Sequence, residues 1–294
     1  MMPGNNLRLL FVINANSGNN TTDWDKLIRD YFEPLDHTIE LYHLTADCRV
    51  QTLKDKIKLF LPQQVIAVGG DGTVKMVAGC LLQQNIALGI IPAGSANGLA
   101  KELGIGNDPL AALGILLTGN PKKIHATLIN DHLCIHLSDI GLNAHAIKIF
   151  EGQGRRGMWG YLIAAIKVLW QKHMMEVELK IDKKTIKIKA ELVVIANGTQ
   201  YGSGAVINPI GQLDDAFFEV IAIKEVTVRE ILKKILFRIA LAADQTELFQ
   251  TDAFTMRSRK PVHFQVDGEY LGKVKSVKAS ILPDALAVMV PATI

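Results

Sequence analysis

Short runs of apolar residues alternate with polar, glycine-rich segments along the first 120 residues. Residues 8–13, 37–44, 64–68 and 86–91 have the length and apolar character of strands. A stretch with helical spacing of apolar side chains follows each strand, at about 23–31, at about 50–60, from Val74 and from Leu99, and a further helix at 109–117 ends at the stop signal Thr118-Gly119-Asn120-Pro121. Repeated strand–helix units predict a parallel sheet with right-handed crossovers.

The pattern changes after Pro121, where short apolar runs are separated by turn signals. Strands are expected at 124–129, 133–137, 177–181, 186–195, 217–223, 262–266 and 285–290. Such spacing favours an antiparallel β-sandwich. The predicted fold class is therefore α/β plus β: an amino-terminal parallel α/β domain at 1–123 and a sandwich domain at 124–282.

Two helices are expected to interrupt the sandwich, at about 158–173 and from the capping pattern at Thr227 to Ile239. Their apolar faces fit either core packing on the sheets or the walls of a lipid cleft. Both interpretations stay open at this point.

Three predicted strands of the first domain open into loops rich in Gly, Ser, Thr and Asn. The strand at 64–68 runs into Gly69-Gly70-Asp71-Gly72-Thr73, the strand at 86–91 into Pro92-Ala93-Gly94-Ser95-Ala96-Asn97, and the strand at 8–13 into Asn14-Ala15-Asn16-Ser17-Gly18. Glycines let the backbone approach a ligand closely, and the following helix N-terminus suits an anion. Asp71 could hold Mg²⁺; the alternative is an ordinary glycine-rich turn with an exposed Asp. Parallel strands would place all three loops at the edge of the sheet where ligands bind.

These loops resemble the signatures of the diacylglycerol kinase catalytic domain superfamily, which includes sphingosine kinases and bacterial lipid kinases. The resemblance spans essentially the whole chain, and NAD kinases and 6-phosphofructokinases share the loop around Asp71 as more distant relatives. It implies that the first domain is an ATP-binding domain of NAD kinase/phosphofructokinase type. It also implies that the tail from about 283 to 294 returns to that domain.

The resemblance assigns nucleotide contacts to the three loops and to the start of the helix after Thr73. Thr45 ends a strand at the same edge, so its hydroxyl faces either the nucleotide or solvent. The implied contacts are Asn14, Ser17, Gly18, Thr45, Gly69, Gly70, Asp71, Gly72, Thr73, Val74, Lys75, Gly94, Ser95 and Asn97. This chain departs from the family pattern at Lys75 (usually Asn), Met76 (usually Glu), Ser95 (more often Thr) and Gly98 (usually Asp or an apolar residue).

The segment Val266-Asp267-Gly268-Glu269-Tyr270 has two interpretations. Taken alone, Asp-Gly between two strands predicts a hairpin turn. The segment also resembles the family's Asp-Gly-Glu motif, in which the Glu is the proton acceptor and the Asp lies beside it. The resemblance therefore implies that Glu269, Asp267 and Asp71 are the catalytic residues.

A second acidic pair, Asp214-Asp215, precedes a predicted strand. The pair alone fits a solvated turn. The family places a structural Mg²⁺ at the corresponding position, which implies Asp215 as a ligand together with the backbone carbonyls of Gln212 and Phe217. The family usually has Gly after this Asp, and Ala216 stands there instead.

Composition limits the functional classes further. The chain has 294 residues, 49% hydrophobic and 21% charged, and a net charge of +3 that gives no argument for nucleic acid binding. Neither a signal peptide in residues 1–8 nor an uninterrupted run of about 20 apolar residues is recognised. The scattered Cys48, Cys80 and Cys134 suggest reduced thiols. We therefore expect a soluble cytoplasmic protein that contacts the inner face of the membrane transiently. The sequence does not decide whether the protein forms a homodimer.

One predicted hairpin is strongly basic, with Lys180, Lys183, Lys184, Lys187 and Lys189. The charges either protect an edge strand from pairing or attract an anionic membrane surface. The function that these patterns predict is an ATP- and Mg²⁺-dependent kinase acting on a lipid hydroxyl, with diacylglycerol as the leading substrate. The alternatives are an NAD kinase-like or other soluble-substrate kinase, and a nucleotide-binding regulator with weak catalysis.

Overall fold

The computed structural model describes residues 6–18, 22–45, 50–152, 158–169, 174–200, 206–225 and 245–292. The chain divides into two compact units, one formed by residues 1–124 with 284–294 and the other by residues 125–283. Two long strands, β5 and β14, cross the boundaries between the units. Each unit is described by itself below.

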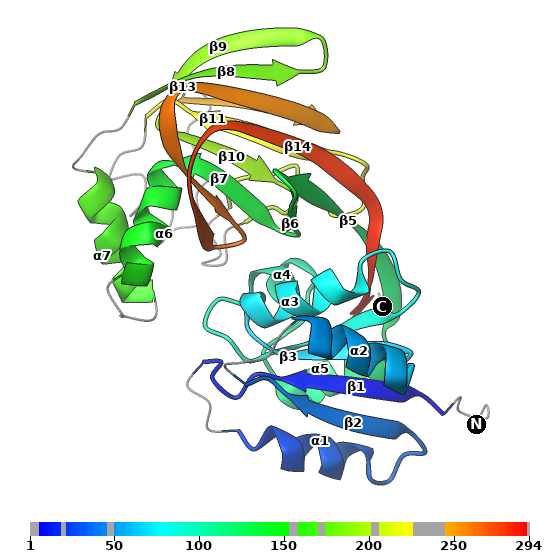
Figure 1. Ribbon diagram of the computed structural model, residues 1–294. Helices are drawn as coiled ribbons and strands as arrows, with labels where there is room; N and C mark the ends of the chain where they lie inside the picture. The colour runs from blue at the N-terminus through cyan, green and yellow to red at the C-terminus, as the bar shows by residue number, and fades with distance from the viewer. Residues whose placement is uncertain are drawn as a thin grey trace. The chain divides into compact units, whose positions relative to one another are not determined.

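The first unit has a parallel sheet with helices on its faces, as the sequence predicts (Figure 1). Its strands are β1 (Arg8–Ile13), β2 (Thr38–His43), β3 (Gln64–Gly69) and β4 (Ala87–Pro92), and its helices are α1 (Trp24–Phe32), α2 (Val50–Phe60), α3 (Asp71–Leu81), α4 (Gly98–Glu102) and α5 (Pro109–Thr118). The strand order is β4-β3-β1-β2, and the end of β14 adds a parallel strand beside β4. Every residue of β3 is buried, which explains its continuous apolar run.

The position of β1 inside this sheet decides where a ligand can bind. The crossover after β1 leads to β2 on one side, and the next crossover brings β3 to the other side of β1. Helix α1 accordingly lies on one face of the sheet, and α2 and α3 lie on the other (Figure 1). This reversal is the topological switch point of a doubly wound sheet, and sheets of this kind bind ligands at the carboxyl ends of the strands beside it, here β1 and β3.

The second unit is an antiparallel β-sandwich with two helices, α6 (Leu142–Gly152) and α7 (Met158–Leu169). Its strands are β5 (Asn120–Ile129), β6 (His132–Cys134), β7 (Leu137–Gly141), β8 (Met175–Ile181), β9 (Lys184–Ala190), β10 (Leu192–Ala196), β11 (Phe218–Ile223), β12 (Thr246–Thr251), β13 (Ala253–Val266) and β14 (Glu269–Val290). Strand β13 pairs with β8 through its first half and with β7 through its last residues. The register of β13 against β14 shifts between Arg257 and Val262, where β13 changes partner. The apolar core between the layers includes Leu179, Val193, Phe218 and Phe264.

Several elements of this unit differ from the prediction, which also lacks β12 and covers only the last residues of β13 and β14. The run 186–195 is two strands, because Glu191 separates β9, which pairs with β8, from β10, which pairs with β7 and β11. The run 133–137 is broken after Cys134, because residues 135–137 give their N–H groups to a side chain rather than to a strand. Helix α6 is absent from the prediction because β7 runs directly into it.

The two predicted helices of the sandwich have different outcomes. Helix α7 is described over Met158–Leu169, and its Ala165 and Val168 pack against Leu142 and Ala146 of α6. Ile163 of the predicted apolar face is exposed instead. The helix expected from Thr227 lies outside the described residues. None of the helices in the described ranges is long and apolar enough to span a membrane.

Candidate active site

The loops after β1 and β3 are tied together at the switch point. The backbone N–H of Asn14 donates to the carbonyl of Val68 over 3.0 Å, and the Asn14 side-chain amide donates to the Thr73 hydroxyl over 3.1 Å. Thr73 is buried in the first turn of α3, so this bond holds the first loop against a fixed helix end. Two of the three loops predicted to meet are therefore joined by hydrogen bonds.

The third loop, after β4, contacts the other two backbone to backbone. A Cβ on Gly94 would lie 2.5 Å from the Gly70 Cα, and one on Gly18 would lie 2.4 Å from the Ala93 carbonyl oxygen. Gly18 also has a φ of +63°, a conformation that side chains disfavour. These glycines are required because the loops touch where no side chain fits.

Asn97 closes the third loop. Its side-chain oxygen accepts a hydrogen bond from the Gly94 N–H, and its amide donates to the Gly94 carbonyl, both at 2.9 Å. Its φ of +53° lies in the left-handed region that Asn tolerates better than most residues. Asn97 therefore shapes the loop by its own bonds, and Ser95 is left exposed at the tip.

Asp71 lies differently from the prediction. The apolar spacing predicts a helix that starts at Val74, with Asp71 in the turn before it, whereas α3 begins at Asp71 itself with Gly70 as its N-cap. The half-buried Asp71 carboxylate accepts a 3.4 Å hydrogen bond from the N–H of Leu99 in α4. Asp71 is the first residue of α3 and accepts a hydrogen bond from α4, so its carboxylate is held between these two helices.

The other predicted nucleotide contacts fall into three kinds. Ser17 and Lys75 are half-buried beside the loops, and Thr45 is exposed two residues after β2. Val74 is buried at 4% exposure, so only its backbone can serve a ligand. Gly69 packs against Thr73, and Gly72 has open space around its Cα.

A matched pair of glycine variants tests the close contact between the loops. Gly94→Ala should lower the free energy of unfolding by about 1–3 kcal/mol, because its Cβ would overlap the backbone at Gly70. Gly72→Ala should instead leave stability unchanged or raise it by about 0.5–1 kcal/mol, because a helical Gly with free space gains from a methyl group. Urea unfolding of both variants measures this; equal effects would contradict the close approach of the two loops.

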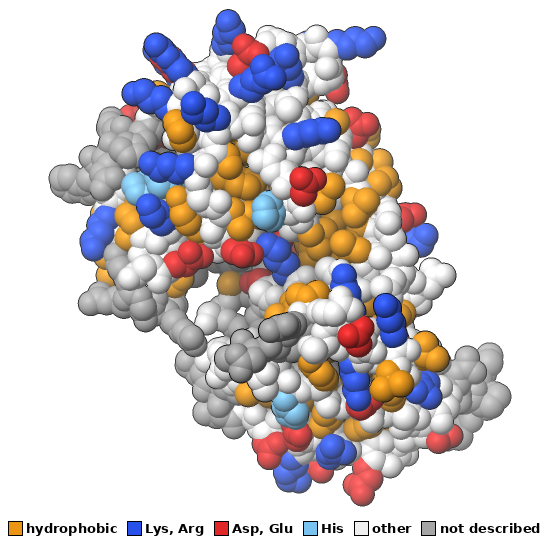
Figure 2. Space-filling view, viewed as in Figure 1, with side chains coloured by type: hydrophobic (Ala, Val, Ile, Leu, Met, Phe, Trp, Pro, Cys, Tyr) orange, Lys and Arg blue, Asp and Glu red, His pale blue; other side chains and the backbone are white. Residues whose placement is uncertain are grey.

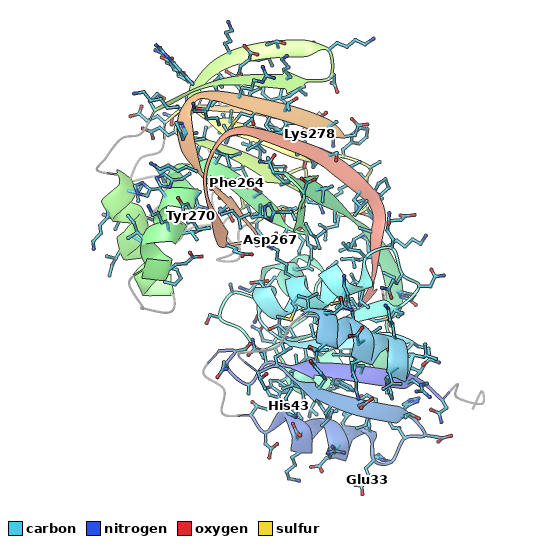
Figure 3. The ribbon with its side chains drawn as sticks, viewed as in Figure 1. Glu33, His43, Phe264, Asp267, Tyr270 and Lys278 are labelled. Carbon is cyan, nitrogen blue, oxygen red and sulfur yellow. The ribbon has the colours of Figure 1, made fainter. Side chains whose placement is uncertain are left out.

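The β13–β14 hairpin of the second unit carries the other predicted catalytic residues, Asp267 and Glu269. Figure 3 labels Asp267 at this hairpin. Asp267 and Gly268 both have positive φ, at +49° and +84°, as a tight hairpin turn requires. The Asp267 carboxylate accepts hydrogen bonds from the N–H groups of residues 135, 136 and 137 at 3.0–3.2 Å. Its oxygens are thus used to hold the segment between β6 and β7, and Asp267 acts as a positioning residue for the turn.

A buried network that the sequence analysis missed supports the same turn. Gln265 donates to the Asp139 carboxylate over 2.6 Å, and its oxygen accepts from the Gly268 N–H over 2.7 Å. Asn143 at the start of α6 also donates to Asp139, which has no exposed surface. Two side-chain amides thus bond to one fully buried carboxyl group, and this network fixes the hairpin tip. The one indication of this network in the sequence is the single carboxyl residue Asp139 within an apolar run.

Glu269 is the exposed first residue of β14, directly after this fixed turn. Its neighbour Tyr270 bonds through its backbone N–H to Glu151 of α6 at 3.3 Å and through its hydroxyl to His263 Nδ1 at 2.8 Å. Burial, and secondarily the charge of Glu151, raise the pKa of Tyr270, so its phenol stays protonated at neutral pH. Glu269 is therefore an accessible carboxylate on a rigid support.

Asp267→Asn tests the positioning role. The variant should lose about 1–3 kcal/mol of stability, because an amide cannot accept all three backbone N–H groups and leaves buried donors unsatisfied. Asp131→Asn is the control, since Asp131 also sits in a hairpin turn at positive φ, is exposed, and has no described side-chain hydrogen bond. Thermal unfolding of both should show a loss for Asp267→Asn only; a stable Asp267→Asn would contradict the assigned role.

Comparison with known families shows which family has both the three loops of the first unit and the hairpin of the second. Residues 8–129 match the model of the diacylglycerol kinase catalytic domain. Residues 139–290 match the model of the YegS C-terminal NAD kinase beta sandwich-like domain. The chain belongs to the diacylglycerol kinase family of lipid kinases. The three loops lie in the first match, and the Asp267–Glu269 hairpin lies in the second.

Individual relatives of this lipid kinase family are distant in sequence. The chain is 27% identical over 237 residues to the "Probable lipid kinase YegS-like" of Chromohalobacter salexigens, covering 78% of this chain and 76% of that protein. It is 24% identical over 219 residues to the "Diacylglycerol kinase" of Staphylococcus aureus strain Newman, covering 71% and 69%. A diacylglycerol kinase structure from Bacillus anthracis strain Sterne has a TM-score of 0.73 at 16% identity over 97% of both chains, which shows a shared fold.

The segment that carries the predicted structural metal of this family is engaged in protein hydrogen bonds. One Asp215 oxygen accepts from the Phe217 N–H and the other from the Gln250 amide, both at 3.3 Å. Gln250 also donates to the buried Glu219 carboxylate, whose pKa is raised by burial and, more weakly, by the charge of Asp215. Across the ranges that the structure describes, no three His, Cys, Asp or Glu side chains cluster around a point that could hold a metal ion. Asp215 would therefore have to exchange these bonds to hold a cation.

Proposed function

We propose that this lipid kinase is ATP- and Mg²⁺-dependent and transfers the γ-phosphate to a hydroxyl of diacylglycerol or a related lipid. The observation that carries the proposal is the contact of Gly70 with Gly94 beside the N-terminus of α3. Backbone without side chains at a helix N-terminus is suited to phosphate groups. The switch point of the sheet is also the place where such folds bind ligands.

Each group has a defined task in this proposal. The loops at Asn14–Gly18, Gly69–Thr73 and Gly94–Asn97 hold the nucleotide phosphates, and Asp71 holds or orients the cation. Mg²⁺, when bound, supplies charge neutralisation on the phosphates. The lipid hydroxyl oxygen forms a bond to the γ-phosphorus as the bond to the ADP oxygen breaks, and the hydroxyl proton passes to the Glu269 carboxylate. Asp267 and Gln265 keep the turn that carries Glu269 in place.

The two alternative functions are a kinase with a soluble acceptor and a regulator without catalysis. An NAD kinase-like enzyme would phosphorylate a soluble substrate, but the second loop, Pro-x-Gly-Ser-x-Asn, fits the lipid kinases. A regulator would bind ATP without turnover, which Lys75, Met76 and Ala216 motivate as departures from the family pattern. The relatives named as lipid or diacylglycerol kinases favour the lipid acceptor.

One panel assay separates the three functions. The protein is incubated with labelled ATP and Mg²⁺ and, in parallel, with diacylglycerol, other hydroxyl lipids in mixed micelles, or NAD. Label in a lipid product supports the proposal. Label in NADP supports the soluble-substrate kinase, and an ATP-induced thermal shift without any transfer supports the regulator.

The proposed metal at Asp215 has its own test. If Mg²⁺ binds there, millimolar Mg²⁺ should raise the Tm of the wild type, and Asp215→Asn should abolish that shift, because binding to the native state stabilises it. Asp214→Asn is the matched control, since Asp214 is the exposed neighbour in the same turn. A shift of equal size in wild type and Asp215→Asn would remove the metal from this turn.

A further inference from the structure

The β-sandwich unit contains a cavity of about 580 Å³ beside the bend of β13. Its lining comes from the start of α6, the start of β8, the end of β9, the bend at residues 258–263 and Lys273 of β14. The ladder between β13 and β14 is interrupted between Arg257 and Val262, so the backbone there is free to bend away and open the hollow. The cavity volume is typical of small-molecule sites.

The floor of this cavity combines buried apolar side chains with two stacked imidazole rings. Leu142, Met175 and Val262 are buried beneath it. The rings of His145 and His263 stack with their centroids 4.1 Å apart and their planes within 2°. His263 is further held by the Tyr270 hydroxyl at 2.8 Å.

The rim of the cavity is strongly basic. Lys189, Arg259, Lys260 and Lys273 face a single lining carboxylate, Glu176, which leaves an excess of three positive charges. Glu176 is shared between Lys189 at 3.9 Å and Arg259 at 3.6 Å. In the described part of the chain, neither Lys260 nor Lys273 has an ion-pair partner. Figure 2 shows Lys and Arg side chains gathered over β8, β9 and β13 with hydrophobic side chains between them.

Position along the strands brings the rim and floor together. Lys273 is the direct cross-strand partner of His263, so their side chains lie on the same face of the β13–β14 pair. Lys189 of β9 is likewise the direct cross-strand partner of Glu176 in β8. A ligand seated on the histidine pair would therefore meet a cation at its edge.

We propose that this cavity binds an anionic amphiphile, a lipid that carries a phosphate group. The phosphate would meet Arg259, Lys260 and Lys273 at the rim, since guanidinium and ammonium groups are the usual partners of phosphate. The adjoining apolar part of the lipid would lie over Leu142, Met175 and Val262. Buried apolar side chains under a cationic rim suit a ligand that has both an apolar part and an anionic part. The inference concerns a binding site in the second unit and does not depend on the kinase reaction.

A pair of double variants with equal loss of charge tests this site. Lys260→Gln with Lys273→Gln removes two charges from the rim, and Lys183→Gln with Lys184→Gln removes two exposed charges from the β8–β9 turn, which does not line the cavity. Binding of the full-length protein is measured by co-sedimentation with vesicles of phosphatidylcholine and phosphatidylglycerol in equal parts, and with pure phosphatidylcholine vesicles. The same measurement is repeated with excess glycerol 3-phosphate as a soluble source of the phosphate group.

The proposal expects binding to the anionic vesicles only, weakened at least about tenfold in the rim variant and no more than about threefold in the turn variant. Glycerol 3-phosphate should compete weakly, because it lacks the apolar part. Equal weakening in both variants would mean a diffuse basic surface and would overturn the site. Equally strong competition by glycerol 3-phosphate would overturn the lipid in favour of a soluble phosphate ligand.

Discussion

Asp71→Ala is expected to lower phosphate transfer by at least about 10²–10³-fold while the first unit stays folded. The carboxylate sits at the N-terminus of α3, beside the backbone contact between Gly70 and Gly94, where the nucleotide phosphates and a cation are proposed to bind. Its structural task is small, because it accepts a single described hydrogen bond, the 3.4 Å bond from Leu99. The cost in stability should therefore stay near about 1 kcal/mol.

The measurement is kcat with thermal unfolding on the same preparation. Asp55→Ala serves as the control, because Asp55 is an exposed carboxylate on α2 whose described partner is Gln51 in the same helix. Full turnover by a folded Asp71→Ala variant would remove the cation and phosphate role from this loop. An unfolded variant would move the test to Asp71→Asn, which keeps the size of the side chain.

Glu269→Gln should lower kcat by about 10²–10⁴-fold, the usual contribution of a general base, and leave ATP affinity within a few-fold. Glu269 is exposed at the start of β14, on a turn fixed by Asp267 and Gln265. The substitution replaces one carboxylate oxygen by an NH2 group of similar size at an exposed position, so the fold should be retained. The acceptor lipid, rather than the nucleotide, is the group that the carboxylate is proposed to serve.

Glu247→Gln is the matched control for this effect. Glu247 lies on β12 of the same unit and forms a 2.8 Å ion pair with Lys224 at the surface, which is worth little to stability. ATP binding and kcat are measured for both variants. Unchanged kcat in Glu269→Gln would take the base away from this hairpin, and a joint loss of ATP binding and kcat would make its role structural.

The sequence was sufficient for features that are encoded locally. The strand, glycine loop and helix around Gly69–Thr73 were predicted because a buried parallel strand is apolar throughout and a tight phosphate-type loop needs glycine. The sandwich is predicted because its strands are short apolar runs separated by turn residues. Even here the sequence places the start of α3 three residues late, because Gly72 and Thr73 have low helix propensity. The hydrogen bond from Asn14, a residue distant in sequence, holds the Thr73 side chain in the first turn.

Features that depend on distant residues could not be predicted. The break between β6 and β7 exists because Asp267, about 130 positions later, takes the N–H groups of residues 135–137. The same long-range bonding gives Asp267 a positioning role that the motif alone did not reveal. Asp139 and Gln265, which lie 126 positions apart, join only in the folded sandwich.

Transfer of labelled phosphate into lipid tests the central claim most directly. The wild-type protein is incubated with γ-labelled ATP and diacylglycerol micelles, with and without Mg²⁺. The label in the organic extract is then counted, and the mass of the lipid product is measured by mass spectrometry. The account predicts Mg²⁺-dependent label in a product heavier than the acceptor by one phosphate, and its loss in Asp71→Ala. Label that stays in the aqueous phase with every hydroxyl lipid supplied, from a protein that binds ATP, would contradict it.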